Sequence, residues 1–351
     1  LGDLNPLLFD LPYQQDRGHP TPADGAWMQN VLSALPTKST RIAAALLVHP
    51  TYQGYAKDPA PLIEQLHSLG CPVLVDEAHG SHFAAGVDDQ LPASALRAGA
   101  DLVVHSLQKS AAGLAQTAVL WLRGQRVDPD RIRRSLGLLQ TTSPSALLLA
   151  SCEAALQQWQ QPRGRDRLRQ RLAESRQLKT SLVADGIPLL DTQDPLRLVL
   201  HTGSAGISGL DADDWFMSHG LVAELPEPAT LTFCLGLAKQ RKLRGQMRKH
   251  WKALNDAHQG KTAFAPFEPP PLPLVSQPAT SPCQAWNAGR RSMPLDAAEG
   301  EVAAELVCPY PPGIPLLIPG EQLDGSRLNW LQRQRTLWGE QIPEQLMVIE
   351  G

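Results

Sequence analysis

Two short polar segments, each following an apolar run, carry the residue types on which enzyme chemistry depends. The segment VLVDEAHGSHF places Asp76, Glu77, His79 and His82 after one run, and DLVVHSLQKSAAG places Lys109 after the next. Asp76 and Lys109 are 109 − 76 = 33 residues apart, about one βαβ unit. Since a right-handed crossover brings both strand ends to the same edge of a sheet, we expect a carboxylate and an amine to meet there.

A lysine at that edge can act as a nucleophile toward an aldehyde. The residues that follow Lys109, from Ser110 to Gly113, are small and leave room beside its amine, and partial desolvation favours the neutral amine that Schiff-base chemistry requires. Asp76 can pair with a protonated pyridine nitrogen. This is the minimum that a protein contributes to catalysis by pyridoxal 5'-phosphate (PLP), and Ser106 and His105 are candidate donors to its phosphate.

Simpler interpretations stay open on spacing alone. Lys109 can be a surface lysine, and Asp76 can cap the segment that follows it. A metal site is also possible, because His79 and His82, with Asp76 or Glu77, have the side chains that zinc prefers. The three-residue spacing in a loop is only weakly specific, however, and we expect no metal.

Composition limits the class of protein. The chain has 351 residues with 32 Lys and Arg against 35 Asp and Glu, a net charge of −3, and 42% of its residues are hydrophobic. These values are typical of a globular protein and give no general attraction to nucleic acid or to a membrane surface. Five scattered cysteines without a CxxC pair predict reduced thiols in a cytoplasmic protein. The start at Leu1 reads as the middle of a domain, so we expect a fragment.

The elements that must position these residues alternate between strand and helix in the first part of the chain. The order β-α-β-α-β-β predicts an α/β sheet with its ligand chemistry at the carboxyl ends of the strands. The apolar run at 43–49 predicts a strand covered on both faces. The other expected strands are 72–75, 102–105 and 118–122, and the expected helices are 59–69 and 93–98.

The remainder of the chain divides further. From 145 to about 182 the pattern is helical, and its basic cluster at 163–176 favours an amphipathic, solvated helix over a phosphate site. Thirteen of the 31 prolines lie between Pro266 and Pro319, which excludes long helices and central strands there. A smaller α+β layer is expected from strands at 196–201 and 230–235 and a helix at 239–254. The predicted domains are 1–145, 146–260 and 261–351.

The amino-acid sequences of five segments, in this order, resemble those of the Orn/Lys/Arg decarboxylase family of the aspartate-aminotransferase fold. They are HPTYQGYAKD, VDEAHGSHF, HSLQKSAAGLAQTAVL, LLQTTSPSALLLAS and the C-terminal CPYPPGIPLLIPGE at 308–321. The resemblance extends over essentially the whole chain. It implies part of a PLP-binding large domain, a smaller α+β layer and a proline-rich C-terminal decarboxylase module.

The resemblance also implies roles for individual residues. Lys109 corresponds to the lysine that binds PLP, and Asp76 to the aspartate that keeps the pyridine nitrogen protonated. Ala78 falls where the family packs a small side chain on the ring face. Ser106 falls where the family contacts the phosphate.

Other positions follow the family less closely. His79 and His82 are implied to lie near cofactor or substrate, and Glu321 lies in the C-terminal motif without an assigned role. Family members commonly carry His directly before the lysine, whereas this chain has Gln108, which can donate to a phosphate but carries no charge. The family also has an earlier glycine-, serine- and threonine-rich phosphate loop, so the chain as given is expected to hold the later half of a cofactor site.

The implied function is PLP-dependent decarboxylation of arginine, lysine or ornithine for polyamine synthesis, with a mild preference for arginine. A homodimer or larger homo-oligomer is implied as well. Two alternatives remain at this stage. One is another PLP enzyme of the same fold, such as an aminotransferase, aldolase or desulfurase, and the other is an inactive remnant or partner subunit.

Overall fold

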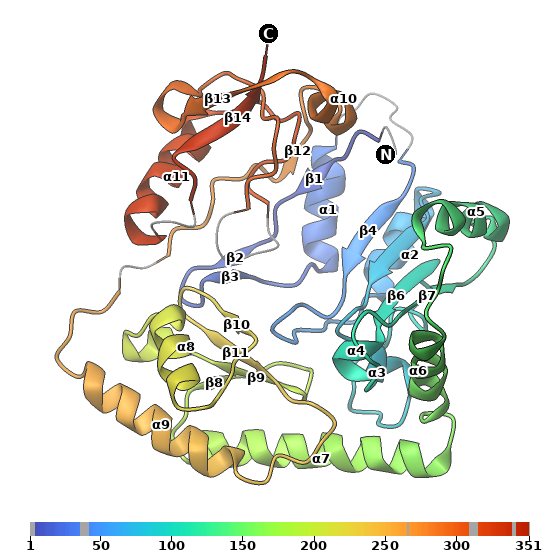
Figure 1. Ribbon diagram of the computed structural model, residues 1–351, viewed down its shortest axis with the longest axis vertical. Coiled ribbons are helices and arrows are strands. Elements are labelled where there is room, and N and C mark those ends of the chain that lie inside the picture. Colours follow the sequence, from blue (N-terminus) through green and yellow to red (C-terminus); the bar gives the residue numbers. More distant parts are fainter. Residues whose placement is uncertain (1–3, 36–41, 265–266, 309–314, 339–341, 351) are drawn as a thin grey trace.

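The computed structural model describes residues 4–35, 42–264, 267–308, 315–338 and 342–350. Figure 1 shows three groups of elements: a sheet with short helices, a second sheet lying on a long helix, and a C-terminal group at the opposite end of the molecule. Part of the expected C-terminal motif, 309–314, lies outside the described residues. In the described part of the chain, no helix has the length and apolar character needed to cross a membrane.

The first sheet has the order β4-β5-β6-β7, with β4, β5 and β6 parallel and β7 antiparallel to β6. All four predicted strands are confirmed to within two residues at each end. The crossover helix predicted at 59–69 is also confirmed, as α2. The bounds are β4 (Ala45–Val48), β5 (Val73–Asp76), β6 (Leu102–Ser106), β7 (Ala118–Leu122), α1 (Gly25–Ala34), α2 (Ala60–Ser68), α3 (Ser81–Ala84) and α4 (Leu107–Ser110).

Two predictions for this region are wrong. β4 is not covered on both faces: Leu46 and Val48 are 66% and 65% exposed, because no element packs on that side of the strand in the described chain. The segment 93–98 forms a turn rather than a helix. The amide of Ala98 donates to the carbonyl of Ser94, but Gly99 has a φ of +100° and the chain turns there, so a single turn forms.

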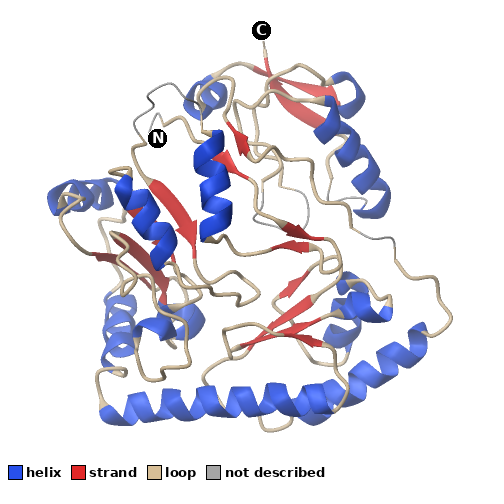
Figure 2. Ribbon diagram, turned by 180° about the vertical axis from the view of Figure 1, so that it is seen from behind, coloured by secondary structure: helices blue, strands red, loops and turns tan. Residues whose placement is uncertain are grey.

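The second sheet is antiparallel throughout, with the order β10-β11-β9-β8. Its strands confirm those predicted at 196–201 and 230–235. Behind it lies the long helix α7, which runs along one side of the molecule beside α9 (Figure 2). The bounds are β8 (Leu189–Leu190), β9 (Arg197–Leu200), β10 (Leu225–Pro226), β11 (Leu231–Cys234), α7 (Pro162–Ala184), α8 (Gly209–Ser218) and α9 (Leu243–His258), with a 3-10 turn at Thr202–Ala205.

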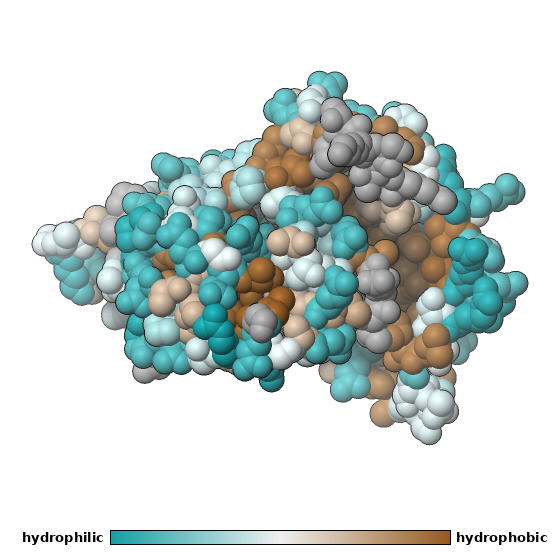
Figure 3. Space-filling model, turned by 90° about the horizontal axis from the view of Figure 1, so that it is seen from above, coloured by the Kyte–Doolittle hydropathy of each residue, from teal (hydrophilic) through white to brown (hydrophobic). Residues whose placement is uncertain are grey.

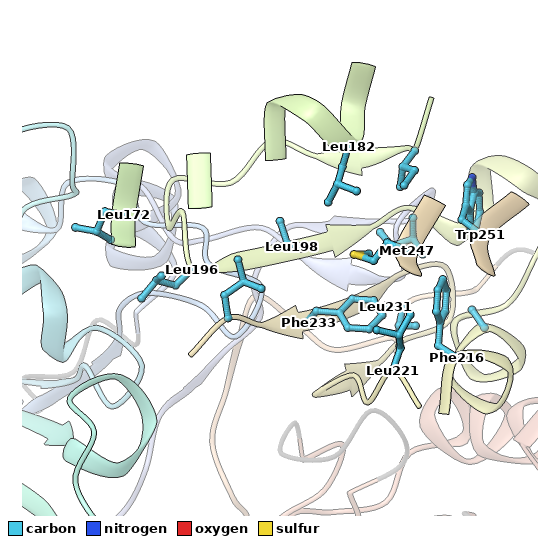
Figure 4. Packing of buried hydrophobic residues seen from close by; sticks show 14 of the residues in the cluster. Leu172, Leu182, Leu196, Leu198, Phe216, Leu221, Leu231, Phe233, Met247 and Trp251 are labelled. Carbon is cyan, nitrogen blue, oxygen red and sulfur yellow. The ribbon is translucent and has the colours of Figure 1, made fainter. Parts of the chain in front are cut away.

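The largest hydrophobic core lies between this sheet and its helices. Leu198 of β9, Phe216 of α8 and Met247 of α9 point toward one another there (Figure 4). Leu172 and Leu182 close the core from α7, which confirms the amphipathic helix predicted for the basic segment. Two arginines of α7 serve structure, since Arg165 and Arg169 donate to carbonyls of the loop after α3.

The helices α5 (Pro129–Leu139) and α6 (Ala146–Gln157) are the least buried in the chain's described part. No residue of α5 is buried, and in α6 Ala155 alone is. Large apolar side chains therefore face outward on both helices, among them Leu138 at 87% exposure. Seen from above, the surface of the molecule shows apolar patches between polar ones, one of them in a hollow (Figure 3).

The C-terminal group has its own core. Leu295, Leu317 and Leu331 are buried in it together with Trp330, whose indole donates to the carbonyl of Glu268 (2.9 Å). The N-terminal strand β1 pairs with β12 of this group. The bounds are β1 (Leu8–Phe9), β2 (Tyr13–Gln14), β3 (His19–Pro20), β12 (Val275–Ser276), β13 (Arg290–Pro294), β14 (Gln345–Ile349), α10 (Pro282–Asn287) and α11 (Gly325–Trp338), with a 3-10 turn at Leu295–Ala297.

Candidate functional site

Asp76 and Lys109 lie at the same edge of the parallel sheet. Asp76 is the last residue of β5 and is in register with Val104 of the neighbouring β6, and Lys109 follows β6 in the single turn α4. Both side chains are exposed. The chain therefore presents an amine and a carboxylate at neighbouring strand ends, as the crossover argument predicts.

The carboxylate of Asp76 is held by its own loop. Its Oδ1 accepts the backbone N–H of Ala78 (3.0 Å), an Asx-type turn that fixes the side chain's direction. Within the described chain, Oδ2 has no hydrogen-bond partner and faces solvent. Ala78 is half-buried beside it.

Glu77 and His105 form a buried pair beside the loop that follows β5. Glu77 is fully buried, and its Oε2 lies 2.7 Å from Nε2 of His105. The indole of Trp121 donates to Nδ1 of the same ring (3.0 Å), so the ring proton is on Nε2 and is donated to Glu77. Because both ring nitrogens are bonded within the protein, the interpretation of His105 as a phosphate donor is wrong for this geometry.

His79 connects the two sheets. Its Nε2 lies 3.0 Å from Nζ of Lys109, and its Nδ1 accepts from Nη2 of Arg197 at the start of β9 (2.7 Å). Burial, followed by the charges of Arg197 and Lys109, lowers the pKa of His79 to about 3. The imidazole is therefore neutral at physiological pH. The ring of Tyr52 packs on it, with centroids 4.3 Å apart.

Arg197 and Asp194 form a buried ion pair behind His79. Their nearest charged atoms are 3.7 Å apart, and Asp194 also lies 3.1 Å from Nε2 of His82 and accepts the backbone N–H of Leu196. Burial alone raises the pKa of Asp194, but His82 and Arg197 outweigh it, so the net shift is downward. Arg197 is thus held in place from the side opposite to His79.

Gly54 allows this packing. Its φ of +89° is in the region that favours glycine, and its carbonyl accepts the N–H of Asp194 (3.0 Å). A Cβ at position 54 would lie 2.7 Å from Cγ and 2.8 Å from Cβ of Arg197. The backbone there approaches the arginine more closely than any side chain permits.

Ser106 and Gln108 precede the lysine on the chain. The carbonyl of Ser106 accepts from the hydroxyl of Ser81 (3.2 Å), while its own hydroxyl has no partner among the described residues. Gln108 is exposed, and its Oε1 accepts the N–H of Gln116 (2.5 Å), which leaves its amide nitrogen as a donor. Each side chain therefore keeps a hydrogen-bond donor that the described residues do not use.

The alternative metal site does not form. His79 and His82 direct their Nε2 atoms to Lys109 and Asp194, and Glu77 is bonded to His105. Over the described ranges, no group of three or more His, Cys, Asp or Glu side chains has an arrangement suited to a metal ion. Glu321 is also accounted for: it is buried in the C-terminal group and binds Arg327 (3.0 Å) and the N–H of Ile318 (2.9 Å).

Sequence reasoning missed Arg197, Asp194 and Glu224. Glu224 is exposed, and its Oε1 accepts from the hydroxyl of Tyr52 (2.7 Å), the ring that also lies 5.8 Å from Nζ of Lys109. The one available signal for Arg197 was a charged residue inside the apolar strand RLVL, since buried charges in strands need a partner.

Comparison with known proteins gives a consistent result over most of the chain. Residues 24–196 match the family described as Orn/Lys/Arg decarboxylase, major domain, and residues 266–343 match its C-terminal domain. Arginine decarboxylase of Bacillus subtilis (strain 168) is 32% identical over 305 residues, 82% of this chain and 60% of that protein. Arginine decarboxylase of Halalkalibacterium halodurans is 31% identical over 299 residues, with the same coverage.

Solved structures show the same fold at lower identity. The constitutive lysine decarboxylase of E. coli superposes with a TM-score of 0.72 at 16% identity, covering 93% of this chain and 60% of that one. Lysine decarboxylase A from Pseudomonas aeruginosa gives 0.75 at 15%, with 97% and 63% covered. The chain therefore spans about 60% of the length of these relatives.

Proposed function

Because the chain belongs to the Orn/Lys/Arg decarboxylase family, we propose that it binds PLP and releases CO₂ from a basic amino acid, with arginine preferred. The preference rests on the relatives named arginine decarboxylase. The product amine would serve polyamine synthesis. The observation that carries the proposal is the meeting of Lys109, His79 and Asp76 at one sheet edge.

The residues present fit PLP. Bound there, the cofactor would supply an aldehyde for the lysine amine and a ring that accepts the electron pair left by departing CO₂. Lys109 offers the amine, Asp76 an unpartnered carboxylate oxygen for the ring nitrogen, and Ala78 a small side chain beside it. The hydroxyl of Ser106 and the amide nitrogen of Gln108 are donors for the phosphate.

Asp76 has the simplest role in this mechanism. Its carboxylate would keep a proton on the nitrogen of a bound pyridine ring, because an opposite charge favours the protonated form. The bond to the N–H of Ala78 holds one oxygen and leaves the other to make that contact. His79 contributes a neutral ring that stays next to the amine of Lys109.

The available carboxylate of Glu224 supports the proposal that the substrate is a basic amino acid. The other carboxylates near the site are committed: Glu77 to His105 and Ala95, and Asp194 to Arg197 and His82. Glu224 is exposed and has one oxygen on Tyr52, across whose ring the amine of Lys109 lies. We infer that it receives the distal cation of the substrate, since a carboxylate is the natural partner of a guanidinium.

Further parts of the proposal concern assembly. We propose that the parallel sheet is the later part of a large domain of the aspartate-aminotransferase fold, with units 1–145, 146–260 and 261–351. A homodimer or larger homo-oligomer is supported by the outward-facing leucines of α5 and α6. A cytoplasmic location is supported by five free cysteines, none in a disulfide.

A direct assay tests this function. The purified chain is given PLP, and we measure its visible absorption and CO₂ release from arginine, lysine and ornithine. We expect a visible band and CO₂ release, both lost in Lys109→Ala and kept in Lys249→Ala, an exposed lysine on α9. Activity that survives Lys109→Ala contradicts the assignment of the lysine. A band without CO₂ indicates another PLP enzyme, and a chain that stays colourless indicates an inactive remnant.

A further inference from the structure

The contact between His79 and its two neighbours poses a chemical question. Arg197 is a permanent cation with donors only, so Nδ1 of His79, 2.7 Å from its Nη2, must be an acceptor. A neutral imidazole carries one ring proton, which is then on Nε2. That N–H points at Nζ of Lys109, 3.0 Å away. The contact is a hydrogen bond only when Nζ offers a lone pair, that is, when the amine of Lys109 is neutral.

We propose that Arg197 is a positioning residue that fixes His79 as the Nε2–H tautomer, so that His79 can donate to the lone pair of the Lys109 amine and thereby favours its nucleophilic form. The consequence for the amine rests on the proposed function, whereas the tautomer is a property of the chain itself. Arg197 reaches the site from β9 of the antiparallel sheet, 118 residues along the chain from His79.

The surroundings of Arg197 are built for this task. The residue is 2% exposed, and its Nη1 donates to the carbonyl of Leu196 and faces the carboxylate of Asp194. Gly54 packs so closely on its aliphatic part that a Cβ at position 54 would lie 2.7 Å from Cγ of Arg197. Arg197 therefore does more than pair with Asp194: its Nη2 is directed at Nδ1 of His79.

The opposite tautomer would reverse the chemistry. With the proton on Nδ1, the ring would oppose the Arg197 N–H, and its free Nε2 would accept from a protonated Lys109. That arrangement stabilises the ammonium ion, which does not attack an aldehyde. The low pKa of His79 agrees with a neutral ring in either case, so the identity of the protonated nitrogen is what Arg197 decides.

The first measurement reads the tautomer in the cofactor-free protein. Nitrogen-15 chemical shifts of labelled histidine distinguish protonated from bare ring nitrogens, and the His79 signal is the one that disappears in His79→Asn. We expect a protonated Nε2 and a bare Nδ1 in the wild type and in Arg197→Lys, which keeps a cationic donor. We expect a mixture of tautomers in Arg197→Met. A wild-type His79 protonated on Nδ1, or on both nitrogens, overturns the proposal.

The second measurement reads the amine. A small aldehyde condenses with a neutral amine with loss of water, and cyanoborohydride adds hydride to the C=N bond, which fixes the product for mass spectrometry. We expect modification of Lys109, relative to exposed Lys249, to fall about 10-fold in Arg197→Met at pH 8, the size of effect expected for one hydrogen bond to a charged group. Arg197→Lys should recover most of it.

Controls separate the possible failures. Arg171→Met removes another buried arginine of the same sheet unit, one that donates to the carbonyl of Gly236, and should leave the Lys109 reaction unchanged. A fall as large as that in Arg197→Met contradicts a specific role for Arg197. If Arg197→Met does not fold, the wild-type tautomer still decides. Because neither measurement uses decarboxylation, an inactive chain with the expected tautomer refutes the proposed function and leaves this inference intact.

Discussion

The two four-stranded sheets contribute different things to the site. The parallel sheet ends in exposed polar groups, Asp76 and Lys109, and its first strand leaves Leu46 and Val48 uncovered. In the antiparallel sheet, all four residues of β9 are buried, and Arg197 among them supports His79 from behind. The reactive groups thus lie on the less completely covered sheet, while the better packed sheet holds the group that orients them.

Substitutions in the antiparallel sheet should lower the free energy of unfolding more than substitutions in the parallel sheet. This is the largest effect that we expect. Phe216 is fully buried in the core of the antiparallel sheet, so Phe216→Ala should lower the free energy of unfolding by about 3–5 kcal/mol. Leu46→Ala, on the uncovered face of β4, should change it by less than about 0.5 kcal/mol. Denaturant titration of both variants measures this difference. Equal losses would contradict the comparison.

Acid should weaken the junction between the sheets. In the unfolded chain His79 takes up a proton as the pH falls through 6.5, whereas the folded protein keeps it neutral down to about 3. Between those values the unfolded state binds more protons, so the free energy of unfolding falls as the pH falls. At pH 5 this amounts to about 2 kcal/mol.

The variant His79→Gln isolates that contribution. Its free energy of unfolding should lose about 2 kcal/mol less than the wild type between pH 7 and pH 5, because no proton is taken up at position 79. Denaturant unfolding at both pH values gives the four numbers needed. The same pH dependence in variant and wild type would mean that His79 is not held neutral by the fold.

The smallest effect concerns what the antiparallel unit offers to substrate. Glu224→Gln should raise KM for arginine about 10-fold with kcat nearly unchanged, because the acceptor for the distal cation keeps an oxygen but loses its charge. Glu64→Gln, an exposed glutamate on α2, is the matched control. Steady-state kinetics decide: an unchanged KM in Glu224→Gln would place substrate recognition elsewhere.

Much of the parallel sheet could be predicted from the sequence, since short apolar runs bounded by Gly and Pro are local signals. The common edge of Asp76 and Lys109 followed from their spacing and the handedness of the crossover. Whether the second face of β4 is covered depends on tertiary packing. The apolar run at 43–49 has the same sequence pattern whether one or both faces are buried. The helix expected at 93–98 is limited to one turn, because Gly99 has a φ of +100° and the amide of Ala100 donates to the carbonyl of Ala95.

For the site, the sequence predicts which residues take part but not which side chains they contact. Lys109, Asp76 and His79 stand in recognisable segments, but the partners of each side chain depend on tertiary contacts. Nothing around His105 in the sequence shows that Trp121 and Glu77 occupy both its nitrogens. The contact of His79 with Arg197 joins residues from different sheets, which no periodicity or spacing reports.

The bare backbone at Gly54 has an evolutionary consequence. A methyl group there would lie 2.8 Å from Cβ of residue 197 and 3.0 Å from Cβ of Asp194, and φ is +89°. A shorter side chain at 197 still carries a Cβ, so it does not free position 54 to accept one. Position 197 should therefore vary across lineages without a matching change at 54, whereas this glycine should persist wherever the backbone is kept.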